Sequence, residues 1–85
     1  MHFNAQVLQG RRLLFVNVAG SAQRVLGGDG LAYWAGKFGL CRGQTIDAGD
    51  YVLVQDSGRV MEIRVLSSTR TSEGPGAASF RGSFR

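Results

Sequence analysis

Apolar and polar residues alternate with a period of two along much of this chain, a pattern that predicts β-strands rather than helices. The clearest example is residues 44–66, QTIDAGDYVLVQDSGRVMEIRVL, where alternating runs at residues 51–55 and 59–66 flank a turn at residues 56–58. We expect a β-hairpin there, with every second side chain of the later run facing a core. The side chains expected in that core are Met61, Ile63 and Val65.

The N-terminal half predicts more strands of the same kind. Residues 3–9 and 12–18 are joined by the short connection Gly10-Arg11, which suits an antiparallel pair. The run at residues 12–18 is apolar on both of its faces, so we expect it to be covered on both sides. Further short strands are expected at residues 23–26 and 31–35, and a Gly-punctuated loop or single helical turn at residues 38–43.

These elements predict an all-β fold without a long helix. At 85 residues the chain is long enough for one domain with a modest core. A small open sheet would leave strand edges unpaired, and closure into a barrel removes them. We therefore expect a small five- or six-stranded antiparallel barrel, SH3-like or OB-like, over residues 1–66.

The composition changes at residues 67–85, SSTRTSEGPGAASFRGSFR, which contain no aliphatic residue larger than alanine apart from the only proline. Such a segment is expected to be disordered by itself, so we expect an extended tail that a partner orders. It ends in a doubled tripeptide, Ser-Phe-Arg, and phenylalanine with arginine is a recurrent anchoring pair. A frayed terminus with chance repetition is the alternative. The predicted partner-binding residues are Arg70, Phe80, Arg81, Phe84 and Arg85.

The charge balance also favours an interface. Ten basic and six acidic residues give a net charge of +4, and nine of the ten cations are arginine. Arginine makes planar, bidentate contacts with carboxylate or phosphate, so the partner is expected to be an acidic protein surface or nucleic acid.

Catalytic chemistry has little support in the sequence. The single histidine, His2, lies at the terminus, and Asp47 and Asp50 are interpreted as turn-capping residues rather than a catalytic pair. Residues 27–30, Gly-Gly-Asp-Gly, lack the lysine and the following helix of a phosphate-binding loop. Cys41 is the only cysteine, which excludes an intrachain disulfide or a cysteine-cluster metal site and favours a reducing compartment. We therefore predict a non-enzyme with no catalytic residue, cofactor or metal.

Targeting signals are not evident either. No apolar run reaches the ~20 residues of a membrane span, and the N-terminus lacks a basic region followed by an apolar one. The expectation is a soluble protein that is not exported and has no membrane partner.

The C-terminal half resembles the small β-barrel proteins that join phage heads to tails. Their pattern is an apolar residue, a Gly-Asp-type turn, a strand, a Gly-Arg turn, and a strand reading apolar-Glu/Asp-Ile, and the match covers about 35 residues. The resemblance implies a non-enzymatic virion component that forms a homo-oligomeric ring or shell and locks neighbours through its loops and termini. The residues that carry it are Tyr33, Trp34, Ile46, Gly49, Asp50, Val52, Gly58, Arg59, Met61, Glu62, Ile63 and Val65.

A second resemblance is to translation initiation factor one-A and its bacterial counterpart, which are RNA-binding OB barrels. It rests on residues 5–8, Gly10-Arg11, residues 36–38 and residues 46–54. It implies a cytoplasmic RNA-binding module in which aromatic side chains stack on bases beside basic residues. The candidate nucleic-acid-binding residues are Arg11, Arg12, Tyr33, Trp34, Lys37, Phe38 and Arg42.

Charge decides which of the two hypotheses ranks first. Residues 67–85 carry three arginines and one glutamate, +2, which leaves +2 of the total +4 for the predicted barrel. A groove for a nucleic-acid strand usually concentrates more cations than this. A structural subunit of a phage virion, assembled in the host cytoplasm, therefore ranks first, and the RNA-binding OB module is the alternative.

Overall fold

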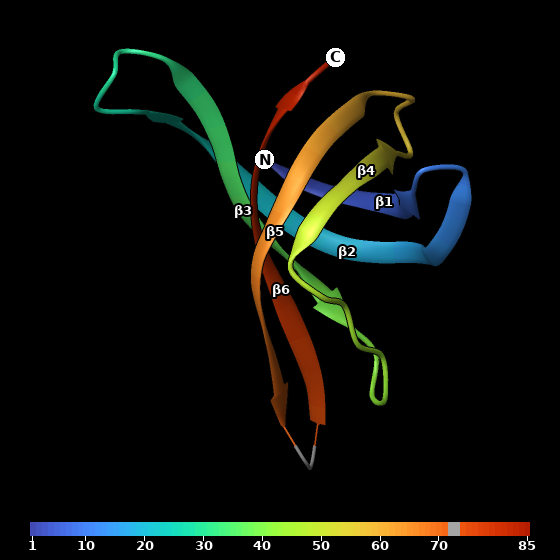
Figure 1. Ribbon diagram of the computed structural model, residues 1–85. Coiled ribbons are helices and arrows are strands. Elements are labelled where there is room, and N and C mark those ends of the chain that lie inside the picture. The colour runs from blue at the N-terminus through green and yellow to red at the C-terminus, as the bar shows by residue number, and fades with distance from the viewer. Residues whose placement is uncertain (72–73) are drawn as a thin grey trace.

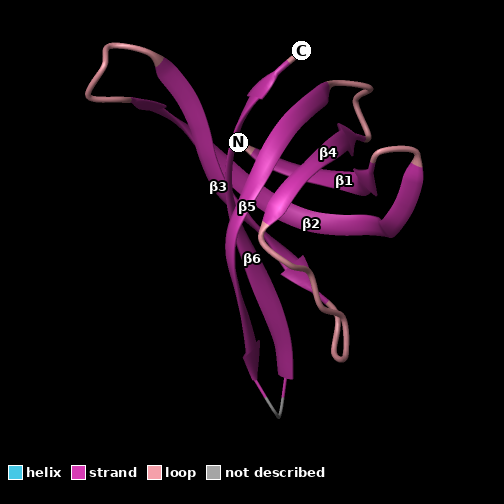
Figure 2. Cartoon of the chain, in the orientation of Figure 1, coloured by secondary structure: helices cyan, strands magenta, loops and turns pink. Residues whose placement is uncertain are grey.

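Six antiparallel strands close into a barrel, as the alternation predicts (Figure 1). The computed structural model describes residues 1–71 and 74–85, and the side chains of residues 70–74 lie outside the description. Neighbouring strands follow the order β1-β2-β3-β6-β5-β4, and β1 pairs with β4 to close the ring. No helix occurs in the described residues, which consist of strands joined by loops (Figure 2). The strands are β1 (His2–Gln9), β2 (Arg12–Leu26), β3 (Ala32–Leu40), β4 (Gly49–Gln55), β5 (Val60–Thr71) and β6 (Gly74–Phe84).

The β4–β5 hairpin confirms the clearest sequence prediction. Tyr51, Leu53 and Gln55 of β4 are buried, and they alternate with residues that are more exposed. On β5 the three predicted core residues, Met61, Ile63 and Val65, are at most 4% exposed. Strict alternation on both strands thus places one face of the hairpin in the barrel interior.

Strand β2 is longer and less regular than the sequence pattern indicates. It runs for 15 residues, pairing first with β1 and then with β3. The register with β1 shifts in two places, and Asn17 there has a φ of 54°, a left-handed conformation that asparagine tolerates better than most residues. The shifts turn Val16 outward, where it is 63% exposed, and Leu13 is 49% exposed. The expectation that this run is covered on both faces is therefore wrong.

Residues 67–85 are not a tail outside the barrel, which corrects the predicted boundary at residue 66. Strand β5 continues to Thr71, and β6 pairs along its length with β5 on one side and β3 on the other. Residues 38–40 likewise belong to β3 rather than to a loop or helical turn. The sheet closes only because β6 fills the position between β3 and β5.

Glycine at two interior positions lets the strands curve tightly enough to close. A Cβ atom at Gly36 would overlap the carbonyl oxygen of Ser21 on β2, and one at Gly82 would overlap the carbonyl oxygen of Glu62 on β5. Both contacts are with backbone, which cannot move aside as a flexible side chain can. Gly82 of the C-terminal segment is thus required by the close approach of strand β5.

Candidate interaction sites

Four of the five predicted anchoring residues of the C-terminus contact other side chains of the same barrel. Phe80 is 1% exposed, with its ring centroid 6.3 Å from that of Phe3 and 6.0 Å from that of Phe38. It is a core residue, so its assignment as a partner anchor is wrong. Its position follows from the alternation of β6, on which Ala78 and Phe80 both face the interior.

The other residues of the doubled Ser-Phe-Arg motif also contact their own barrel. The Arg81 guanidinium lies 4.3 Å from the centre of the Tyr33 ring, and Arg85 forms a 3.4 Å ion pair with Glu62. Both arginines remain exposed, so these contacts are weak by themselves. The side chain of Arg70 lies outside the described residues.

The candidate nucleic-acid-binding residues do not form one surface. Phe38 is 1% exposed and belongs to the core, so it cannot stack on a base. Arg11 and Arg12 lie at the β1–β2 turn and Arg42 lies in the β3–β4 loop, whereas Trp34 is near the start of β3 (Figure 1). Of the predicted set, Tyr33, Trp34 and Lys37 share strand β3, with Lys37 exposed and the two aromatic rings partly buried.

A cluster that the sequence did not single out lies around Trp34. The rings of Trp34 and Phe84 meet edge to face, 5.4 Å apart at 81°, and the Arg59 guanidinium lies 3.7 Å from the centre of the Phe84 ring. Arg24 is the cross-strand partner of Trp34. These four residues line a hollow of about 240 Å³, here named the arginine–aromatic hollow. The residues that complete its lining are Ala32, Tyr33 and Ser83.

The hollow escaped prediction because its members come from four strands or their ends. The sequence predicts Arg59 only as part of a Gly-Arg turn, and Phe84 as a partner anchor in a terminal repeat. In the sequence 25 positions separate these two residues, yet β5 and β6 pair so that Met61 faces Phe84. Only the closed sheet brings them together.

A second feature is the tip of the β2–β3 hairpin, which projects from the barrel (Figure 1). Leu26 and Leu31 flank its loop and are 74% and 70% exposed. The loop is held by its own hydrogen bonds, in which Gly27 N–H donates to the Leu31 carbonyl and Leu31 N–H donates to Asp29 Oδ1, at 2.8 and 2.9 Å. The hairpin tip, defined as residues 26–31, is therefore an ordered apolar surface with one carboxylate.

An apolar groove of about 580 Å³ lies elsewhere on the same sheet. Its lining includes Met1, Ala35 and Leu66, of which Met1 is 39% and Leu66 is 52% exposed. Lys37 is the one Lys or Arg among the lining residues, which include no Asp or Glu. This surface, named the Leu66 groove, thus combines exposed apolar side chains with the positive charge of Lys37.

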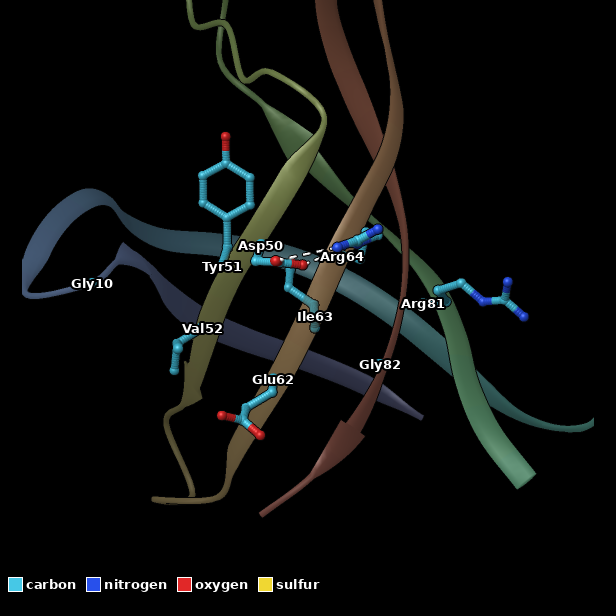
Figure 3. Close-up of a pocket in the computed structure, with 9 residues that line it drawn as sticks. All are labelled: Gly10, Asp50, Tyr51, Val52, Glu62, Ile63, Arg64, Arg81 and Gly82. Atoms are coloured by element: carbon cyan, nitrogen blue, oxygen red, sulfur yellow. Dashed lines mark hydrogen bonds and ion pairs between the residues drawn. The ribbon is translucent and has the colours of Figure 1, made fainter. Parts of the chain in front are cut away.

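The outer face of β4 and β5 carries an ion pair instead of the expected turn cap. Arg64 Nε donates to Asp50 Oδ1 at 3.0 Å, and Arg64 Nη2 donates to Oδ2 at 3.3 Å (Figure 3). The hydrogen bond and positive charge of Arg64 lower the pKa of the Asp50 carboxyl. The ion pair lines an open hollow on this face of the barrel. Arg81 lines the same hollow but extends away from the pair (Figure 3). Both carboxylate oxygens of Asp50 accept hydrogen bonds from Arg64, so we interpret Asp50 as a structural residue.

Asp47 contacts strand β4 through its backbone. Its carbonyl oxygen accepts a 2.8 Å hydrogen bond from the Tyr51 hydroxyl. Burial and the nearby Asp47 charge raise the pKa of Tyr51. This bond ties the β3–β4 loop to the start of β4.

The described residues show neither a metal-binding cluster nor a membrane-spanning helix. No group of three His, Cys, Asp or Glu side chains there could hold a metal ion. The same residues contain no helix able to cross a bilayer. Comparison with known proteins finds no matching family model, no matching curated protein and no matching solved structure.

Proposed function

We propose that this chain is a non-enzymatic structural subunit that assembles with further copies of itself. The observation that carries the proposal is the hairpin tip, where Leu26 and Leu31 are 74% and 70% exposed on an internally hydrogen-bonded loop. Full burial of a leucine side chain contributes about 1.5–3 kcal/mol. Two such residues on a projecting, preorganised loop are typical of an interaction surface.

The Leu66 groove supplies a complementary surface on the same molecule. Leu66 and Met1 offer apolar contact area, and Lys37 offers a positive charge opposite to that of Asp29 on the tip. An acidic apolar tip and a basic apolar groove fit a contact between one copy and the next. Such a contact is heterologous, because different surfaces of the two copies meet, and it generates a ring where the rotation closes.

The resemblance to phage head-to-tail joining proteins supports a ring in a virion as the setting. The sequence predicts locking contacts through both the loops and the C-terminus, and in this proposal the loop between β2 and β3 makes them. Phe80 of β6 packs in the barrel core, so it is not free to anchor a neighbouring copy.

Sedimentation velocity of the isolated protein tests the proposal. The isolated contact is small, so the protein is examined from about 10 µM to 1 mM, where weak association is visible. We expect the wild type to self-associate and the double variant Leu26→Ser/Leu31→Ser to associate about 100-fold more weakly or worse. The control is Leu13→Ser/Val16→Ser, which removes two other exposed apolar side chains of β2 and should associate like the wild type.

A charge exchange tests whether the tip meets the groove. Lys37→Asp should weaken association, and adding Asp29→Lys should restore it, because the pair of opposite charges is re-formed. A wild type that stays monomeric at about 1 mM, or a control variant that dissociates as much as the leucine variant, would refute the proposal.

A further inference from the structure

The arginine–aromatic hollow combines cationic and aromatic side chains, which together suit a ligand that carries an anionic group beside an aromatic ring. Arg59 lies over the face of Phe84, 3.7 Å from the ring centre. A guanidinium stacked in this way keeps its N–H groups directed in its own plane, so they remain available for bidentate contact with phosphate. Stacking also fixes the group in one orientation before a ligand arrives.

Arg24 adds a second cation to the same hollow. It is the cross-strand partner of Trp34, and none of the residues lining the hollow is acidic. Among the described residues, neither Arg24 nor Arg59 forms an ion pair. Two positive charges that lack an internal counterion attract an external anion.

Trp34 provides the apolar surface beside these charges. Its ring is partly buried against Phe84, so it is held in place while part of it remains accessible. A nucleobase stacked on an aromatic side chain gains about 1–3 kcal/mol of binding free energy, whichever base it is. Arginine beside such a ring is the usual partner for the adjoining phosphate.

We infer that this hollow binds single-stranded nucleic acid, with a base against Trp34 and a phosphate between Arg24 and Arg59. A free small molecule is a poorer fit, because about 240 Å³ is below the range of ~300–1,000 Å³ typical of pockets that enclose one. A strand does not need enclosure, since it gains affinity from successive contacts along its backbone. This site is independent of the assembly role, because it uses neither the leucines of the hairpin tip nor the Leu66 groove.

A neighbouring hollow contains a similar arginine–aromatic pair that is not expected to bind phosphate, and it provides a control variant. There Arg81 lies 4.3 Å from the centre of the Tyr33 ring, a pairing of the same kind as Arg59 with Phe84. Asp29 also lines that hollow, and its carboxylate disfavours phosphate. Arg81→Gln therefore removes an exposed, ring-stacked arginine close to the site without removing a proposed phosphate contact.

The experiment uses the full chain and a labelled strand of about eight nucleotides, as RNA and as DNA, with binding followed by fluorescence anisotropy. For the wild type, quenching of Trp34, the only tryptophan, reports contact at the hollow. Loss of a hydrogen bond to a charged group lowers affinity about tenfold or more, which is the expectation for Arg24→Gln and for Arg59→Gln. The slope of log affinity against log salt should fall by about 0.7 for each. Arg81→Gln should change affinity by about twofold or less.

Binding of either strand with this ranking of variants supports the inference, and the tighter of the two identifies RNA or DNA as the ligand. Arg59→Lys keeps the charge but loses the planar contact, so it should bind more weakly than the wild type. Three results would overturn the inference: no strand binding at about 50 mM salt, an equal loss in Arg81→Gln, or equally tight binding of adenosine monophosphate alone. Self-association is measured on different variants, so either proposal can fail without the other.

Discussion

Replacing Phe80 by alanine tests whether β6 belongs to the barrel core. Phe80 is 1% exposed and lies between Phe3 of β1 and Phe38 of β3, on a strand that pairs with both β3 and β5. Its removal would leave a cavity in contact with two aromatic rings. If residues 67–85 were instead a tail ordered by a partner, the same change would leave the isolated chain unaffected.

The expected loss is large for a chain of this size. Truncation of a buried phenylalanine costs about 3–5 kcal/mol, which combines the lost transfer free energy with the cavity that remains. At about 0.05–0.15 kcal/mol per residue, the whole 85-residue chain has a free energy of unfolding of about 4–13 kcal/mol. Phe80→Ala should therefore remove about a quarter or more of the stability and can leave the protein partly unfolded.

Urea unfolding followed by circular dichroism measures this loss, with Phe84→Ala as the matched control. Phe84 lies on the same strand and also contacts an aromatic ring, Trp34, but it is only partly buried. Phe84→Ala should cost less than Phe80→Ala, because its site opens to solvent and no closed cavity forms. A loss below about 0.5 kcal/mol in Phe80→Ala would refute the assignment of β6 to the core.

Two further predictions concern strand crossing and pH. Gly82→Ala should destabilise the fold by about 1–3 kcal/mol in the same assay, because the added Cβ overlaps the Glu62 carbonyl oxygen. Gly39→Ala is the control and should cost less, because the nearest atom to its added Cβ is at an ordinary 3.7 Å. Equal losses in the two variants would contradict the steric argument. Because Arg64 lowers the pKa of Asp50, the pair stabilises the folded state above the ordinary aspartate pKa, and this contribution is lost as pH falls through the folded-state pKa. Carboxyl-carbon NMR should show the Asp50 pKa rising toward its ordinary value in Arg64→Gln, and an unchanged titration would exclude Arg64 as the cause.

The β4–β5 hairpin could be predicted from sequence because local signals agree there. Alternation, β-branched residues and the Asp-Ser-Gly turn all specify the same pairing and the same buried face. Strand β2 lacks that agreement. Its register shifts near Asn17 add residues that have no partner on β1. After such a shift the alternation continues on the opposite face of the strand, so alternation in the sequence predicts the wrong side chains as buried.

Strand β6 was missed for a different physical reason. A segment poor in aliphatic residues is expected not to pack, because it buries little apolar area to offset its ordering entropy. In this chain two other contributions offset the ordering entropy of β6. Both edges of β6 are hydrogen-bonded, and its two phenylalanines enter the core or its margin. Small residues are also the only ones that fit where β6 crosses β5, as Gly82 shows.

The same closure explains why the arginine–aromatic hollow could not be found by reading along the chain. The predicted cation Arg12 lies at one end of β2 and Arg24 lies near the other, where the closed sheet brings Arg24 together with residues from β3, β5 and β6. What the sequence did carry was the pair of leucines around the Gly-Gly-Asp-Gly loop. A hairpin tip has no core to bury such residues, so two leucines there indicate a partner. The two proposals therefore rest on separate observations: the exposed leucines of the tip, and two arginines that form no ion pair among the described residues. The separate variants described above test each proposal alone.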